Sequence, residues 1–234
     1  MALGTTLSAA TTVSLTLGTH DIVFNSAGIS ATQAIADAGG NLTVCLMAYH
    51  LDYSNNAPVQ DGDNTQIRVY YVEAGGGNIP KLLIENASGG VTTLSAESSG
   101  SDDDSYLINN VIDDGSVSWD TVRGDVDTVG SDYSSDSGLS YAGIYARKSS
   151  GRGGDVITII ARSYFVFDLS AGYADTVAVK MQVMMSAFGT QTGDFPKIIA
   201  VQATTLAGST ADFGNCFVAD VAVTDNATFF GANF

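Results

Sequence analysis

The residues that most often carry catalysis are few in this chain. Its two histidines, His20 and His50, lie in different segments. Zinc sites and Ser–His or Cys–His nucleophile systems need histidines at matched spacing or beside a nucleophile motif, and neither pattern occurs. No P-loop and no Gly-x-Gly-x-x-Gly after a strand pattern is present. Carboxylates are plentiful, but nothing marks one as the raised-pKa acid of a glycosidase. We therefore expect a protein that is not an enzyme.

Clustered aspartates suit a metal ion better than they suit catalysis. The segments Asp61-Gly-Asp63-Asn64 and Asp102-Asp-Asp104 place several oxygen ligands on turn-rich stretches, and Ca²⁺ binds such ligands on flexible loops. Neither segment has EF-hand spacing, and a solvated acidic loop is the commoner explanation. No cofactor is certain, and the one that the sequence allows is a structural calcium ion held by Asp61, Asp63, Asp102 and Asp104.

Aromatic side chains could bind a glycan if they were exposed. Tyr133, Tyr141 and Tyr145 lie in a polar segment rich in Gly and Ser, and Trp119 is the one tryptophan. Sugar-binding platforms usually present aromatic rings to solvent. These four residues are the candidates for a glycan site, whereas most other tyrosines fit strand patterns.

The charge of the chain restricts its partners. Nine Lys and Arg stand against 25 Asp and Glu, which gives a net charge of −16. Such a surface repels nucleic acid phosphates and anionic lipids. No stretch approaches the roughly 20 apolar residues of a membrane span. No basic residue precedes Arg68, so the positive region of a secretory signal is missing. We expect neither nucleic acid nor membrane as a direct partner.

Two cysteines, Cys45 and Cys216, lie in apolar runs that are typical of strands. A free Cys packs as a small hydrophobic residue, so buried free thiols are the simpler interpretation. One long-range disulfide is the alternative, and spacing alone does not decide between them.

Composition and alternation predict an all-β fold. The 22 Asp and three Glu favour turns over helices. Short alternating or apolar segments recur along the chain, as in an antiparallel β-sandwich. We expect a jelly-roll-like sandwich with an extended N-terminal arm and at most one short helix, at Ala31–Ala38. The predicted strands are Thr12–Leu17, Leu42–Leu51, Gln66–Glu73, Lys81–Ile84, Val156–Leu169, Thr176–Met185, Ile198–Ala203 and Phe217–Val223.

The chain is expected to have three parts. Residues 1–20 form an N-terminal arm and first strand. Residues 21–105 are rich in β patterns and form either a small domain or part of one sandwich. Residues 106–234 form the jelly-roll sandwich. The Gly-, Ser- and Thr-rich stretch from Glu85 to about Ser105 is either a long loop or the boundary.

The stretch Trp119–Phe213 resembles the jelly-roll modules called DNRLRE or disaggregatase-related domains. The matching core is Ala161-Arg-Ser-Tyr-Phe-Val-Phe-Asp-Leu-Ser170, close to the strand R-x-h-h-x-F-D-L/T-S of that family. The strands Asp175–Val183 and Ile198–Gln202 and the turn Ala211–Phe213 follow in the same order. The resemblance covers about two-fifths of the chain, and only the R…FD pair is moderately specific.

One feature departs from that family, because the loop Leu169–Tyr173 lacks its usual proline. The strand assignments do not depend on this loop. Arg162 and Asp168 lie six residues apart, so on one extended strand they point the same way. A charge on an apolar face is best tolerated when it is paired. We therefore expect Arg162 and Asp168 to be a structural pair.

The resemblance implies a role in assembly or display, because such modules occur in phage virion proteins and in surface proteins. The first hypothesis is a non-enzymatic virion structural protein of a tailed phage, such as a capsid-decorating or head-fibre component. It would bind itself and other virion proteins. The alternative is a carbohydrate-binding or adhesive module at a cell surface or in an extracellular filament. Exposed aromatic residues and calcium-dependent glycan binding would favour the alternative.

Overall fold

The computed structural model describes residues 11–12, 18–60, 64–70, 76–97, 106–112, 118–119, 122, 131–135, 141–150, 156–191 and 197–203. Strands make up most of this part, with one short α-helix, α1 (Ser26–Ala38), and a π-helical turn, η1 (Tyr49–Tyr53). A short 3-10 turn, η3, spans Gly76–Asn78. No helix in the described part is long and apolar enough to cross a membrane. The strands are β1 (Thr11–Thr12), β2 (Gly18–Val23), β3 (Asn41–Ala48), β4 (Asn64–Tyr70), β5 (Lys81–Asn86), β6 (Val91–Ser95), β7 (Tyr106–Ile112), β8 (Ser131–Ser135), β9 (Tyr141–Ser150), β10 (Val156–Asp168), β11 (Thr176–Gln191) and β12 (Lys197–Gln202).

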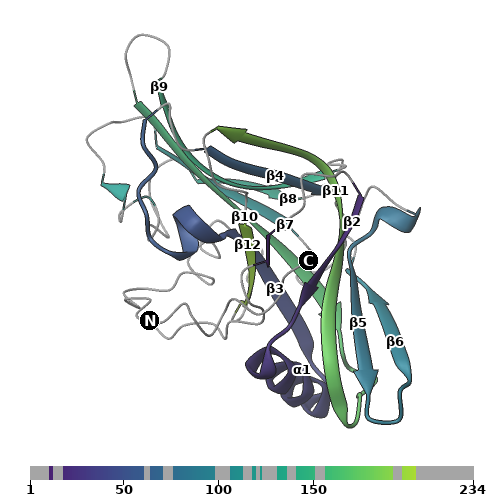
Figure 1. Cartoon of the computed structure of the whole chain (residues 1–234). Helices are drawn as coiled ribbons and strands as arrows, with labels where there is room; N and C mark the ends of the chain where they lie inside the picture. Colours follow the sequence, from purple (N-terminus) through teal and green to yellow (C-terminus); the bar gives the residue numbers. More distant parts are fainter. Residues whose placement is uncertain are drawn as a thin grey trace.

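The strands form an antiparallel sandwich, which confirms the predicted fold class (Figure 1). One layer runs β1–β12–β3–β10, and β7 and β8 continue it on the other side of β10. The second, called here the β2–β11–β5–β6 layer, has the strands in that order. Strands β9 and β4 lie between β10 and β11 and join the two layers.

The long strand β11 takes part in both the β2–β11–β5–β6 layer and the connection between the two layers. Its first part pairs with β5 and its last part pairs with β4 on the same side. The pairing register shifts between Met185 and Ala187, and such an irregularity bends a strand and increases its twist. Because of this bend, β11 can pair with β5 in the β2–β11–β5–β6 layer and also with β4.

The core lies where β3 and β10 are buried on both faces. Seven of the eight residues of β3 are buried, all except Asn41. Along β10, burial is continuous from Thr158 to Phe167. Phe165 and Phe167 pack in one cluster with Val179 and Leu82 of the β2–β11–β5–β6 layer. A strand covered on both sides needs apolar residues at successive positions rather than strict alternation, as both sequences have.

Helix α1 covers the end of the sandwich where β3 and β11 begin (Figure 1). The Asn25 side chain accepts a 2.8 Å hydrogen bond from the Gly28 N–H, and Gly39 ends the helix with a φ of 67°. Asn is a preferred N-cap and Gly a preferred left-handed terminus. The predicted helix is therefore present, but it begins at Ser26 because Asn25, and not Ser30, caps it.

Several strand predictions need correction. The predicted strand Leu42–Leu51 ends at Ala48, and η1 begins at the next residue, Tyr49. The presumed long loop after Glu85 contains β6. Strands β2, β7, β8 and β9 were not predicted at all. The predicted strand Phe217–Val223 and most of Thr12–Leu17 lie outside the described residues, as do the first ten residues of the arm.

Strands from the two expected β-rich parts are interleaved. β3 from residues 21–105 lies between β10 and β12, and β4 lies between β9 and β11. β11 from residues 106–234 lies between β2 and β5. The described strands of both parts therefore share one hydrogen-bonded network and one core.

Candidate interaction surface

The outer face of the β2–β11–β5–β6 layer exposes aliphatic side chains. Alternation buries Ile22 of β2 and Val179 of β11, and it turns their neighbours outward. Among the described residues, four large hydrophobic side chains are exposed: Val23 at 47%, Val91 at 58%, Val177 at 50% and Val59 at 62%. Val23, Val91 and Val177 belong to strands of this layer, and Val23 and Val91 line the same pocket on its outer face. Single exposed apolar residues are ordinary, but a cluster on one face indicates an interaction site.

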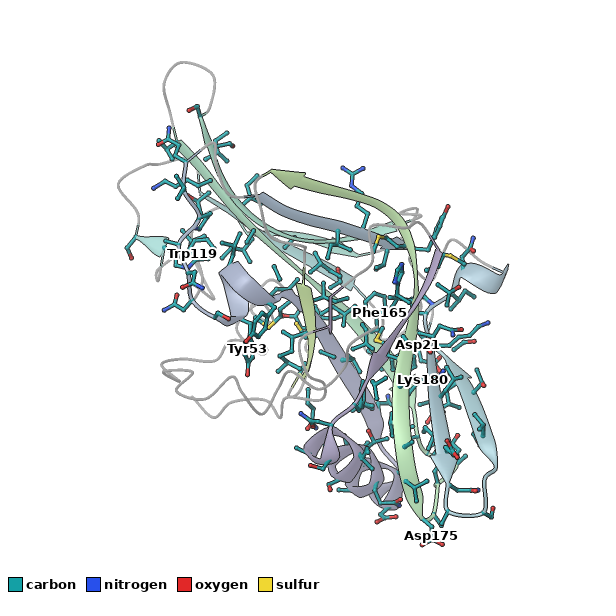
Figure 2. The ribbon with its side chains drawn as sticks, viewed as in Figure 1. Asp21, Tyr53, Trp119, Phe165, Asp175 and Lys180 are labelled. Atoms are coloured by element: carbon teal, nitrogen blue, oxygen red, sulfur yellow. The ribbon has the colours of Figure 1, made fainter. Side chains whose placement is uncertain are left out.

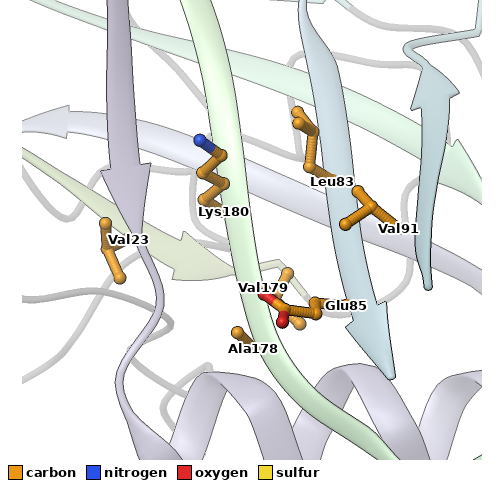
Figure 3. A pocket seen from close by; sticks show the side chains of 7 residues that line it. All are labelled: Val23, Leu83, Glu85, Val91, Ala178, Val179 and Lys180. Atoms are coloured by element: carbon orange, nitrogen blue, oxygen red, sulfur yellow. The ribbon is translucent and has the colours of Figure 1, made fainter. Parts of the chain in front are cut away.

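A shallow pocket lies on this face, as Figure 3 shows. It has a volume of about 250 Å³ and is lined by aliphatic side chains together with Glu85 and Lys180. Small-molecule sites usually enclose about 300–1,000 Å³ and bury most of their ligand. This pocket is therefore better suited to one protruding side chain of a protein partner. The aliphatic lining includes Val23, Leu83, Val91 and Ala178.

One ion pair ties β2 to β11 on the same face. Lys180 Nζ donates to Asp21 Oδ2 at 2.6 Å, and Gln182 Nε2 donates to Asp21 Oδ1 at 3.0 Å. Partial burial raises the pKa of Asp21, but the hydrogen bonds from Lys180 and Gln182 and the charge of Lys180 lower it more, so the pKa lies below its usual 3.8. Figure 2 shows the two charged residues adjacent on the outer side of the layer. The pair fixes the layer and neutralises one of its few positive charges.

A second ion pair in the described part is fully buried beside β10. Arg162 Nε donates to Asp52 Oδ2 at 2.8 Å, and Nη2 donates to Asp52 Oδ1 at 2.7 Å. Both side chains are fully buried. Burial lowers the pKa of Arg162, but the adjacent Asp52 raises it more, and the guanidinium stays charged. The π-helical turn η1 brings Asp52 to this position directly after β3.

The predicted pair of Arg162 with Asp168 is wrong. Six residues along a strand span about 20 Å, so two side chains on one face of one strand cannot meet at that separation. Asp168 is instead exposed at the end of β10, where its Oδ1 accepts a 2.7 Å hydrogen bond from the Ser170 N–H. A side-chain hydrogen bond with Ser170, together with that backbone bond, lowers the pKa of Asp168. Asp168 therefore begins a turn, and Arg162 was correctly expected to have a carboxylate partner.

The calcium candidates Asp61, Asp63, Asp102 and Asp104 lie outside the described residues. Within the described ranges, no group of three or more His, Cys, Asp or Glu side chains could hold a metal ion. The structural calcium site therefore stays a prediction.

The glycan candidates fall partly within the structure. Trp119 is half-buried and packs against the core, and its Nε1 is buried with no hydrogen-bond partner among the described residues; Figure 2 labels it. Tyr133 lies in β8, and Tyr141 and Tyr145 lie in β9, but their side chains are outside the description. A half-buried indole offers less of its face than a sugar platform needs.

Cys45 is disulfide-bonded, which overturns the interpretation of two buried free thiols. The only other cysteine of the chain is Cys216, which lies outside the described residues.

Sequence reasoning missed the residues that matter most on the outer face. Val91 lies in a five-residue strand within a polar stretch, and Asp21 and Val23 lie in a strand that was not predicted. Asp52 had a usable signal, because a buried arginine requires a carboxylate and Asp52 directly follows the apolar run Leu42–Leu51. No family model, curated protein or solved structure matches the chain. The resemblance to DNRLRE modules therefore stays a prediction.

Proposed function

We propose that this chain is a non-enzymatic structural protein that acts through contacts between subunits, as a capsid-decorating, head-fibre or similar component of a tailed-phage virion. The observation that carries the proposal is the outer face of the β2–β11–β5–β6 layer. It brings the exposed side chains of Val23 and Val91 together in one small aliphatic pocket. The assignment to a virion rests on the resemblance of Trp119–Phe213 to modules found in such proteins.

The chemistry of the surface favours a protein partner. Interfaces between proteins are apolar and poor in charge at their centre, with a polar rim. Here the aliphatic residues surround one neutralised pair, Asp21–Lys180. The chain as a whole carries a net charge of −16, which disfavours nucleic acid and anionic membranes. The disulfide of Cys45 is compatible with a particle that leaves the cell.

Sedimentation velocity of the full chain tests the proposal. We expect the sedimentation coefficient to rise with protein concentration, because copies associate through this layer. Val91→Lys places a charge on the face and should return the chain to the monomer. The matched control is Val59→Lys, which makes the same substitution at an exposed valine outside the layer. It should associate like the wild type.

Two results would contradict the proposal. The first is a wild-type chain that stays monomeric at every concentration and also fails to bind purified phage heads. The second is association that Val91→Lys and Val59→Lys weaken equally, because that would be an effect of charge alone and not of this layer.

A further inference from the structure

The outer edge of β6 carries backbone groups without partners in the described part of the chain. Within the β5–β6 hairpin, the Asn86 N–H donates to the Gly90 carbonyl at 3.0 Å, and the Ala96 N–H donates to the Pro80 carbonyl at 2.9 Å. Hydrogen-bonded and non-hydrogen-bonded pairs alternate along an antiparallel ladder. With the observed register, Thr92 and Leu94 therefore bond inward to β5, and the N–H and C=O groups of Val91, Thr93 and Ser95 point to the open edge.

Within the described residues, this edge lacks the features that normally block strand addition. Natural edge strands are protected by lysine, proline, a bulge or a covering segment. β6 reads Val-Thr-Thr-Leu-Ser and has no charge, no proline and no register shift against β5. Four of its five residues are exposed. The opposite edge strand of the same layer, β2, carries His20 and Asp21. An uncharged open edge is unusual in a chain with a net charge of −16.

The hairpin holds this edge in a fixed shape. The Asn86 side-chain Oδ1 accepts hydrogen bonds from the Ser88 N–H at 3.1 Å and from the Gly90 N–H at 2.9 Å. Gly89, with a φ of 82°, completes the turn. A preformed edge loses less conformational entropy when a partner strand binds. The structure therefore presents β6 ready for pairing.

We propose that β6 pairs with β6 of a second copy of this chain, antiparallel and centred on Thr93. A two-fold axis at Thr93 makes the edge self-complementary, because the same residues serve both copies. Thr93 would face Thr93 of the second copy, and Val91 would face its Ser95. All of the outward backbone groups of Val91, Thr93 and Ser95 find partners in this register. A shift by one residue in either direction leaves some of them unpaired.

The side chains fit the same register. On the outer face, Val91 lies opposite Glu85 of β5, and Ser95 lies opposite Lys81. Because Val91 of one copy faces Ser95 of the other, Glu85 of one copy and Lys81 of the other lie in the same line across the joined sheet. Like charges directly opposite each other would destabilise a sheet, and this register brings none together. The pairing also extends the outer face of the layer across both copies.

This inference rests on the proposed function and names the partner of the same layer. Its test is the variant Thr93→Cys in the full chain, treated with a mild thiol oxidant. Facing residues of a hydrogen-bonded pair have Cα atoms about 5.5 Å apart, within the range of a disulfide. Two thiols then give up two electrons and two protons to the oxidant and form one S–S bond. We expect a covalent dimer on a non-reducing gel.

The matched controls are single cysteines at the neighbouring outward positions. Ser95→Cys alone should not cross-link, because two copies of Ser95 lie about 13 Å apart along the strands in this register. A mixture of Val91→Cys and Ser95→Cys chains should cross-link to each other. Wild-type chain, whose Cys45 is already in a disulfide, should give no covalent dimer.

Each outcome decides between the two proposals. If Thr93→Cys forms a covalent dimer and Ser95→Cys alone does not, the symmetric β6 pair is supported. If the chain associates in sedimentation velocity but Thr93→Cys does not cross-link, the β6 pair is overturned and the proposed assembly role is still supported. A chain that neither associates nor cross-links overturns both. Thr93→Pro removes an outward N–H and no hydrogen bond to β5, so its loss of association with an unchanged circular dichroism spectrum would support the pair further.

Discussion

Arg162 is a charge at the centre of an apolar sheet, and Asp52 makes that position tolerable. The two-point contact satisfies both carboxylate oxygens. Desolvating two charges can cost more than their attraction returns, so such a pair fixes one arrangement of η1 over β10 rather than adding much net stability. Removing one partner is a different matter, because it leaves an uncompensated buried charge.

Asp52→Asn should lower the free energy of unfolding by about 3–5 kcal/mol, the usual cost of breaking a buried pair. Denaturant unfolding, followed by the midpoint at constant slope, measures it. The double variant Asp52→Leu with Arg162→Met should recover most of the loss. Asp168→Asn is the control and should change little, because Asp168 is exposed. Equal losses for Asp52→Asn and Asp168→Asn would contradict the assigned pairing.

The Asp21–Lys180 pair makes a pH prediction. The pKa of Asp21 is lowered in the folded chain, so the carboxylate adds stability above its unfolded pKa, and this stability is lost as the pH falls through the folded pKa. The contribution should be at most about 1 kcal/mol, because the pair is partly exposed.

Urea midpoints of wild type and Asp21→Asn should therefore differ near pH 7 and converge as the pH falls below 3.8, the ordinary value for aspartate. A difference that stays constant from pH 7 to below that value would show that Asp21 acts through packing and not through its charge.

Among the elements, those with a strong local pattern were predictable. β10 and β11 have long alternating or apolar runs, and their beginnings at Val156 and Thr176 were predicted correctly. β6 and β2 were missed because they are short and partly polar, and only their pairing with β5 and β11 makes them strands. Asp52 could be picked out as a carboxylate after an apolar run, but its pairing with Arg162, 110 residues away in the sequence, could not be predicted. Contacts of that range leave no local signal.

Helix α1 gives a prediction that separates the observed cap from the one suggested by sequence. Asn25→Ala removes the side chain that accepts from the Gly28 N–H, and it should cost about 1 kcal/mol of stability. Ser30→Ala changes an exposed position within the helix and should be neutral or slightly stabilising, because Ala favours helices. Thermal unfolding compares the two. A larger loss for Ser30→Ala would contradict the assigned cap.

At the scale of the whole molecule, assembly must overcome charge repulsion. Each chain carries a net charge of −16, so copies that approach through the β2–β11–β5–β6 layer repel one another. Salt screens this repulsion beyond the Debye length, which is about 10 Å at 0.1 M ionic strength. The layer itself contributes aliphatic contacts and open backbone groups, which salt does not weaken. Self-association should therefore strengthen with ionic strength, the opposite of an interface held by ion pairs.

The most direct test is sedimentation velocity of the full chain over a concentration series at low and at high salt. The account predicts a sedimentation coefficient that rises with concentration and rises further in high salt, with Val91→Lys remaining monomeric and Val59→Lys behaving as wild type. A single monomer coefficient at every concentration and salt would contradict self-assembly through this layer. So would association that weakens as salt is added.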